Sequence, residues 1–275
     1  MKTIAINKAF LDNLNNWFIN YVKKFKSGEK EFDQNIVMKE KHTFRVVKEI
    51  LSLGKILGLE GENLRLAEIT ALLHDIGRFQ QYARYGTFVD LLSEDHAALG
   101  VKIIKREGIL NNLDEAHRSL ILRTVSYHNR AKLPPEETKP CLFFTKLLRD
   151  ADKLDIYKVV TDYYHRKNKK RNKAIELGLP DTPDISRAVF NAVITDKIVD
   201  GREIKNLNDF KLLQVGWIYS VNFQPTFEEI RKRKYLEMIR ATLPKTEEID
   251  KIFAHVNSYL DERLKKIVPK IKPGR

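Results

Sequence analysis

Four histidines and two aspartates in this sequence have the residue types and spacing that suit metal chemistry. Imidazole and carboxylate groups are ligands that first-row divalent metals favour in proteins. Each of the six lies in a segment with helical periodicity. They occur in the order His42, His74, Asp75, His96, His128 and Asp152. We therefore expect one buried metal site assembled from segments that are far apart in the sequence.

Helical spacing explains how these side chains can face one interior. His74 lies three residues after Ala71 on the apolar side of a predicted helix, and His128 lies three residues after Val125. Asp152 is in register with an apolar stripe in the same way. Because residues three or four apart share a helix face, these polar groups point inward with the core side chains. A buried charge is strongly disfavoured without a partner, and a metal ion would satisfy both residue types together.

The adjacent pair His74 and Asp75 indicates a centre of two metals. Neighbouring residues of a helix lie about 100° apart around its axis, so both side chains can reach one cavity from different directions. A carboxylate has two oxygens, and Asp75 can therefore bridge two ions about 3.5 to 4 Å apart. Such a pair of ions suits phosphoester hydrolysis, because it polarises phosphoryl oxygens and activates a water.

Helices must position these residues, because apolar side chains recur at helical spacing along almost the whole chain. No alternating strand pattern of useful length occurs. The expected helices cover residues 7–26, 42–57, 64–76, 93–107, 116–128, 141–164, 185–198, 209–221, 226–242 and 245–266. The sequence therefore predicts an all-α fold.

Glycine, proline and capping residues predict where these helices end. Gly77 is expected to stop the third helix, and Gly108 follows the fourth. Ser93 is the expected N-cap of the fourth helix. Residues 129–140 contain three prolines and form a predicted loop. Residues 79–92, between two ligand-bearing helices, are either a packed loop or a clamp for a base or aryl group.

The composition is that of a globular protein with a basic balance. The 275 residues are 43% hydrophobic, and 50 Lys and Arg against 37 Asp and Glu give a net charge of +13. A positive charge suits phosphate-bearing partners, although solvated lysine-rich helix faces also produce it. The single cysteine, Cys141, excludes a disulfide framework and a zinc site of several cysteines. No apolar run approaches the roughly 18 to 20 residues that span a bilayer, so we expect a cytoplasmic protein without a membrane partner.

The ordered set of histidines and aspartates resembles that of the HD-domain metal-dependent phosphohydrolases. Three local sequences are similar to the family: ALLHDIGRFQQY at 71–82, SEDHAALG at 93–100 and RDADKLD at 149–155. The resemblance covers about residues 38–160. It implies that the all-α fold is an HD-domain helical bundle.

A change of composition after Tyr164 divides the chain. Residues 165–173 read HRKNKKRNK, which is either a solvated linker or a basic segment that attracts polyphosphate or nucleic acid. We expect three parts: an N-terminal helix at 1–29, the HD domain at 30–165, and a C-terminal helical extension at 166–275.

The resemblance also implies two bound divalent ions, with Mn or Fe favoured and Mg, Co and Ni as further candidates. The ligands of the first ion would be His42, His74, Asp75 and Asp152. The ligands of the second ion would be Asp75, His96 and His128. Mononuclear members of the family lack the two middle histidines.

The activity implied is hydrolysis of a phosphate ester or anhydride bond in a small, nucleotide-like substrate by a metal-activated water. Asp75, Arg78 and Lys153 are the expected catalytic residues, and Arg78 and Lys153 would also contact the substrate phosphate. Tyr82 and Arg84 are expected to help bind the substrate. His128 is followed by Asn129 instead of a second histidine, and a GYP sequence is missing, which argues against cyclic di-GMP as the substrate.

Two other functions stay open on the sequence. Some HD-domain relatives cut nucleic acid, and the net charge of +13 is compatible with a nuclease. The third possibility is a metal-bound sensor or scaffold without catalysis, in which the extension recruits a partner. The sequence leaves the oligomeric state open as well.

Overall fold

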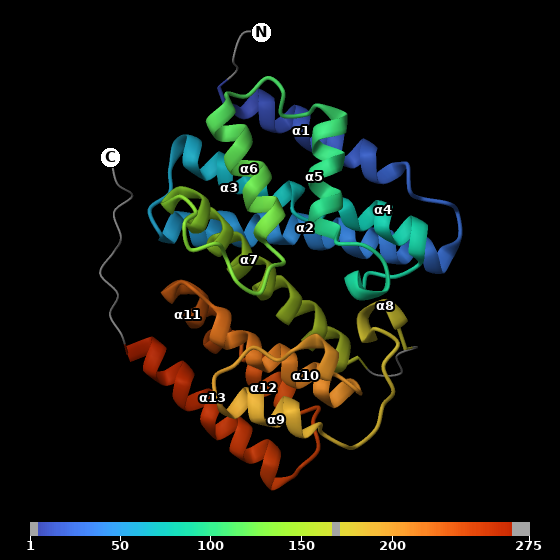
Figure 1. Cartoon of the computed structure of the whole chain (residues 1–275), viewed down its shortest axis with the longest axis vertical. Coiled ribbons are helices and arrows are strands. Elements are labelled where there is room, and N and C mark those ends of the chain that lie inside the picture. The colour runs from blue at the N-terminus through green and yellow to red at the C-terminus, as the bar shows by residue number, and fades with distance from the viewer. Residues whose placement is uncertain (1–4, 167–170, 266–275) are drawn as a thin grey trace. The chain divides into compact units, whose positions relative to one another are not determined.

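Every regular element in residues 5–166 and 171–265, which are the residues described by the computed structural model, is a helix (Figure 1). The predicted all-α class is therefore confirmed. The chain divides into two compact units, and the boundary lies between Asp152 and Lys153, inside one long helix. The three-part division at residues 30 and 166 stays a prediction.

The first unit contains the helices that carry the expected metal ligands. Its elements are α1 (Lys8–Lys23), α2 (Lys30–Ile56), α3 (Gly61–Leu73), α4 (Ile76–Tyr85), the 3-10 helix η1 (Asp90–Leu92), α5 (His96–Glu107), α6 (Glu115–Tyr127) and the first part of α7 (Lys139–Tyr164). Helix α2 packs on α3 and α4, α4 packs on α5, and α6 packs on both α3 and α5.

Helix α2 is longer than the sequence pattern predicted. It begins at Lys30, whereas the expected helix began near His42. Its buried stripe continues toward the N-terminus to Ile36, so the helical period persists beneath a polar, lysine-rich surface. His42 lies on the buried face of the helix, as its spacing from Val46 predicted.

The expected stop at Gly77 is wrong. Helix α3 ends at Leu73, and Gly77 lies in the first turn of α4. A Cβ atom at Gly77 would lie 2.1 Å from the His96 carbonyl oxygen and 2.8 Å from the Gly100 nitrogen. The glycine therefore permits close contact between α4 and α5. The break between α3 and α4 falls at His74 and Asp75, the two adjacent residues predicted as ligands.

The N-cap of α5 is also two residues away from its predicted position. Asp95, not Ser93, caps the helix, because its Oδ1 accepts hydrogen bonds from the backbone N–H groups of Ala97 and Ala98 at 2.9 and 3.0 Å. The Ser93 hydroxyl instead donates to the Val89 carbonyl at 2.8 Å. The predicted end of the helix before Gly108 is confirmed, with Gly108 at φ 65°.

Residues 79–92 are not one loop. The first part belongs to α4, which ends where Gly86 takes the left-handed conformation at φ 65°. The last part contains η1, which brings Asp90 beside the expected metal ligands. Apolar Phe79 and Tyr82 are buried, because α4 turns them toward the interior of the unit.

The second unit is also built from helices. Its elements are the remainder of α7, α8 (Lys173–Glu176), α9 (Arg187–Ile194), the 3-10 helix η2 (Gly201–Glu203), α10 (Leu207–Gly216), the 3-10 helix η3 (Trp217–Ser220), α11 (Gln224–Lys232), α12 (Tyr235–Arg240) and α13 (Glu247–Lys265). Helix α9 packs on α10 and α13, and α11 packs on α12 and α13. The Tyr157 hydroxyl on α7 donates to the Gln214 carbonyl on α10 at 2.8 Å.

One expectation for this unit needs correction. Residues 226–242 are not a single helix, because Lys234 takes the left-handed conformation at φ 55° and separates α11 from α12. His255 on α13 has a side chain that is 38% exposed, and its Nε2 lies 2.8 Å from Asp196 Oδ1.

Among the helices of the described residues, none combines the length and the apolar character that crossing a membrane requires.

Candidate metal centre

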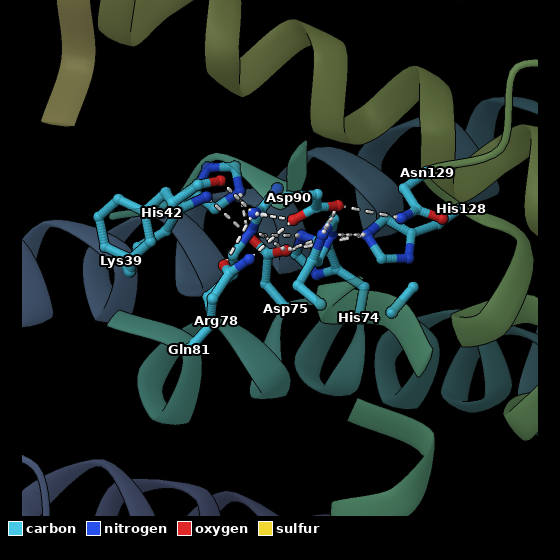
Figure 2. A network of polar contacts seen from close by, with 12 residues as sticks. Lys39, His42, His74, Asp75, Arg78, Gln81, Asp90, His128 and Asn129 are labelled. Atoms are coloured by element: carbon cyan, nitrogen blue, oxygen red, sulfur yellow. Dashed lines mark hydrogen bonds and ion pairs between the residues drawn. The ribbon is translucent and has the colours of Figure 1, made fainter. Parts of the chain in front are cut away.

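The six predicted ligands come together in the first unit from four helices and one helix junction. Helix α2 supplies His42, the α3–α4 junction supplies His74 and Asp75, α5 begins with His96, His128 caps the end of α6, and α7 supplies Asp152 (Figure 2). All except Asp152 are buried, and the Asp152 side chain is 22% exposed. The sequence prediction that these residues share one interior is thus matched by the geometry.

The ligand atoms form two groups, and each group lies within 4.8 Å. One group is His42, His74 and Asp152, and the other is Asp75, His96 and His128. Three or four nitrogen and oxygen donors at this spacing can surround one divalent ion.

Asp75 lies between the two groups and turns one oxygen toward each. Its Oδ2 is 3.5 Å from His42 Nε2 and 3.6 Å from His74 Nε2. Its Oδ1 is 3.3 Å from His96 Nε2 and 3.7 Å from His128 Nε2. This arrangement is the one that a carboxylate bridging two metal ions requires.

Hydrogen bonds at Nδ1 orient three of the histidine rings. His74 Nδ1 lies 2.7 Å from the Ala71 carbonyl oxygen, and His128 Nδ1 lies 2.7 Å from the Val125 carbonyl oxygen. Carbonyl oxygens only accept hydrogen bonds, so each Nδ1 carries the hydrogen and donates it. The Nε2 of each ring then faces the interior, as in metal-ligating histidines.

His96 is oriented by a carboxylate in place of a carbonyl. Its Nδ1 donates to Asp90 Oδ2 at 2.7 Å. Asp90 also lies 2.8 Å from an Arg78 guanidinium nitrogen, and the Gln81 amide donates to it at 2.8 Å. A third group of closely spaced candidate ligand atoms comes from Asp90, Asp95 and His96. In the described structure, His96 Nδ1 donates its hydrogen to Asp90 instead of offering a lone pair to an ion.

The six side chains suit a metal ion because their histidine Nε2 atoms and carboxylate oxygens lie close to one another. His96 Nε2 lies 3.0 Å from His128 Nε2. Burial lowers the pKa of His96 to about 3, with Arg78 contributing, and burial lowers the pKa of His74 to about 4. The His96 ring is therefore neutral near pH 7, and a cation between lone pairs satisfies both rings. His74 Nε2 is buried and makes no hydrogen bond in the described residues.

Both aspartate ligands are ionised. Burial alone would raise the pKa of Asp75, but Lys39 and His74 hold it well below its usual value. Burial would likewise raise the pKa of Asp152, and the hydrogen bond and charge of His42 lower it instead. The two carboxylates therefore offer negative charge to a divalent ion, and the neutral rings of His74 and His96 offer nitrogen donors beside them.

Sequence reasoning missed Lys39 and Asp90, which contact the ligands directly. Lys39 Nζ lies 2.7 Å from Asp75 Oδ2. Lys39 lies three residues before His42, and residues at this spacing share a helix face, so the sequence could have placed Lys39 beside the predicted ligands. No such signal pointed to Asp90, because only the fold of the 79–92 segment brings its carboxylate to His96.

Of the four predicted substrate-binding residues, Arg78 contacts a predicted ligand directly, because its Nε is 3.5 Å from Asp75 Oδ1. The Tyr82 hydroxyl accepts a hydrogen bond from the Asn35 amide at 2.6 Å. Arg84 is exposed and lies 3.1 Å from Glu94, and Lys153 is buried next to Asp152 in sequence. Contact of Tyr82, Arg84 and Lys153 with substrate stays a prediction.

Comparison with known proteins supports the family resemblance. A family model described as the HD domain matches residues 40–157, a range that contains all six expected ligands. Neither the curated proteins nor the solved structures gave a match. HD domains are generally metal-dependent hydrolases that bind divalent metals, and the two histidine and aspartate groups agree with that property. Residues 40–157 of this chain are therefore an HD domain.

Proposed function

We propose that this HD domain hydrolyses a phosphate ester or anhydride bond of a small, nucleotide-like substrate at a centre of two divalent ions. The observation that carries the proposal is the position of Asp75, whose two oxygens face two separate pairs of histidines at 3.3 to 3.7 Å. The ligands would be those that the sequence predicted for each ion. Mn and Fe are the ions we favour, because the donor set is rich in imidazole.

The two ions would polarise the phosphoryl oxygens and supply a hydroxide near neutral pH. The protein side chains fix the geometry for that chemistry. The carbonyl oxygens of Ala71 and Val125 hold His74 and His128, and the Asp90 carboxylate holds His96. Because each Nδ1 is already engaged, Nε2 is the atom available to an ion in these three rings.

Arg78 is positioned to stabilise negative charge beside the centre. Its guanidinium is fixed by Asp90, by the Gln81 side chain and by the Phe88 carbonyl oxygen. The Arg78 Nε faces Asp75 at 3.5 Å. A planar guanidinium held in this way can contact a phosphoryl oxygen with little loss of side-chain freedom. We propose that Lys153 contributes a second positive charge to the substrate phosphate.

The substrate class rests on the family resemblance and on the charge of the chain. A net charge of +13 favours substrates that carry several negative charges. Asn129, which follows His128, donates to Asp95 Oδ1 at 3.1 Å and is exposed beside the ligands. Because of the family resemblance and the net charge, a nucleotide with a terminal or bridging phosphate is the first class of substrate to test. Tyr82 and Arg84 are the proposed contacts for its base.

The test is hydrolysis of a panel of nucleotides, phosphomonoesters and phosphodiesters by protein loaded with Mn²⁺ or Fe²⁺. We expect turnover by the wild-type chain and a loss of about a thousandfold or more in Asp75→Asn, which keeps the side-chain shape but removes the charge. His165→Asn is the matched control, since it alters an exposed histidine of the second unit. Absence of turnover across the panel, with metal bound, would contradict the proposal.

A further inference from the structure

Lys39 lies against the metal centre, although it precedes the residues that match the HD domain. It occupies α2 three residues before His42, so the two side chains share one helix face. Its Nζ is 2.7 Å from Asp75 Oδ2, and its side chain is 17% exposed. Figure 2 shows Lys39 and His42 together at one side of the cluster.

The oxygen that Lys39 contacts is the one that an ion would use. Asp75 Oδ2 also lies 3.5 Å from His42 Nε2 and 3.6 Å from His74 Nε2. An ion held by these two histidines would bind the same oxygen. The ammonium group and a divalent cation would therefore share one carboxylate oxygen at close range, where like charges repel.

Without a metal, the same lysine compensates a buried negative charge. Asp75 is only 3% exposed, and a carboxylate at that depth is strongly disfavoured unless a positive group is nearby. The Phe88 ring helps to hold that group in place, because Lys39 Nζ lies 5.6 Å from the ring centroid. The lysine is thus fixed between Asp75 and an aromatic face.

We propose that Lys39 is an internal counter-cation that stabilises the metal-free centre and weakens the binding of a divalent ion at His42 and His74. The inference rests on the proposed function, because it assumes that the centre binds metal. It makes Lys39 a regulator of occupancy: the residue sets the metal concentration at which this half of the centre fills.

The test uses Lys39→Gln, which removes the charge and keeps a hydrogen-bond donor near Asp75. Full-length protein treated with a chelator is titrated with Mn²⁺ in a calorimeter. We expect Lys39→Gln to bind at least one ion on the order of tenfold more tightly than wild type. We also expect a lower melting temperature for the metal-free variant.

Two matched variants separate the local charge from other effects. Lys41→Gln changes the net charge equally at an exposed position of the same helix, and it should leave Mn²⁺ affinity unchanged. Lys39→Arg keeps the charge and should bind Mn²⁺ like the wild type. If Lys39→Gln folds only when Mn²⁺ is added, the proposed stabilisation of the metal-free centre is supported.

The contradicting outcomes are distinct. Unchanged or weaker Mn²⁺ binding by Lys39→Gln, while the wild type binds, overturns the role of Lys39 and leaves the proposed function intact. A raised KM with unchanged Mn²⁺ affinity also overturns it, because Lys39 would then contact substrate. Failure of Lys39→Gln to fold even with Mn²⁺ would count against it as well. Absence of Mn²⁺ binding by the wild type removes both the proposed function and this inference.

Discussion

At the scale of single residues, the centre depends on which nitrogen of each histidine is free to bind an ion. His74 and His128 donate through Nδ1 to backbone carbonyl oxygens of their own helices, which a side-chain substitution cannot remove. His96 donates to the side chain of Asp90, which a substitution can remove. Of these three hydrogen bonds, only the one to Asp90 can be removed by a substitution. Asp90 is therefore the residue at which the effect of ring orientation on metal binding can be tested.

Replacing Asp90 should weaken metal binding without removing a ligand. In Asp90→Ala, His96 loses the acceptor that fixes its ring, and we expect Mn²⁺ affinity to fall by about 10- to 100-fold. Asp90→Asn retains an acceptor oxygen and should lose less. Calorimetric titration with Mn²⁺ measures both variants, and Glu94→Gln, at a carboxylate that pairs with Arg84, is the control. Equal affinity in Asp90→Ala and wild type would show that Asp90 does not position His96.

The buried histidines also predict how the metal-free protein responds to acid. Burial lowers the pKa of His74 to about 4 and of His96 to about 3, whereas both titrate near about 6.5 in the unfolded chain. As the pH falls below about 6.5, the unfolded state binds protons before the folded state does, so the free energy of unfolding decreases. Asp75 and Asp152, whose pKa values are lowered, act in the same direction at lower pH.

Denaturant unfolding of chelator-treated protein between about pH 8 and pH 5 measures this dependence. We expect the stability to be nearly constant above the histidine range and to decline below it. A stability that stays level or rises as the pH is lowered would contradict the assignment of neutral, buried imidazoles to His74 and His96.

At the scale of elements, the interruption between α3 and α4 brings the two adjacent ligands together with α5. The helices end at Leu73 and resume at Ile76, so His74 and Asp75 lie at the junction. Gly77 then allows α4 to contact the first turn of α5, where His96 lies. The relative position of Asp75 and His96 therefore depends on this close helix contact.

A methyl group at Gly77 should separate the two helices. The added Cβ would meet the His96 carbonyl oxygen at 2.1 Å, a backbone atom that cannot move alone. We expect Gly77→Ala to lower the free energy of unfolding by about 1 to 3 kcal/mol and to weaken Mn²⁺ binding. Gly201→Ala, with no atom within 4 Å of the new Cβ, is the control. Wild-type stability and metal affinity in Gly77→Ala would show that this contact is not required.

Most helices could be predicted from apolar spacing, but their junctions could not. The stripe of Leu14, Phe18 and Val22 predicted α1 directly. Gly77 misled the prediction because a glycine can end a helix or permit a close approach, and only the neighbouring helix decides between them. The six proposed ligands could be found in the sequence because most of them share a helix face with apolar residues, and Asp75 directly follows one of these, His74. Asp90 was not, since tertiary contacts alone bring η1 to His96.

At the scale of the whole molecule, all six proposed ligands belong to the unit that ends at Asp152. The second unit has its own core, in which Asp209 accepts hydrogen bonds from the backbone and hydroxyl of Ser186 at 2.7 and 2.6 Å. We therefore expect metal occupancy to be a property of the first unit. Three statements stay predictions: the division of the chain at residues 30 and 166, the cytoplasmic location and the role of the basic segment 165–173. Residues 167–170 of that segment lie outside the described residues.

The measurement that tests this account most directly is the metal content of the full-length chain, purified without chelator, with Asp75→Ala beside it. Two divalent ions per chain in the wild type, and loss of them in Asp75→Ala, is the result predicted for a carboxylate that bridges two ions. One ion per chain would contradict the two-ion centre and leave His96 and His128 without the proposed role. No ion, even after reconstitution with Mn²⁺ or Fe²⁺, would contradict the metal-dependent hydrolase itself.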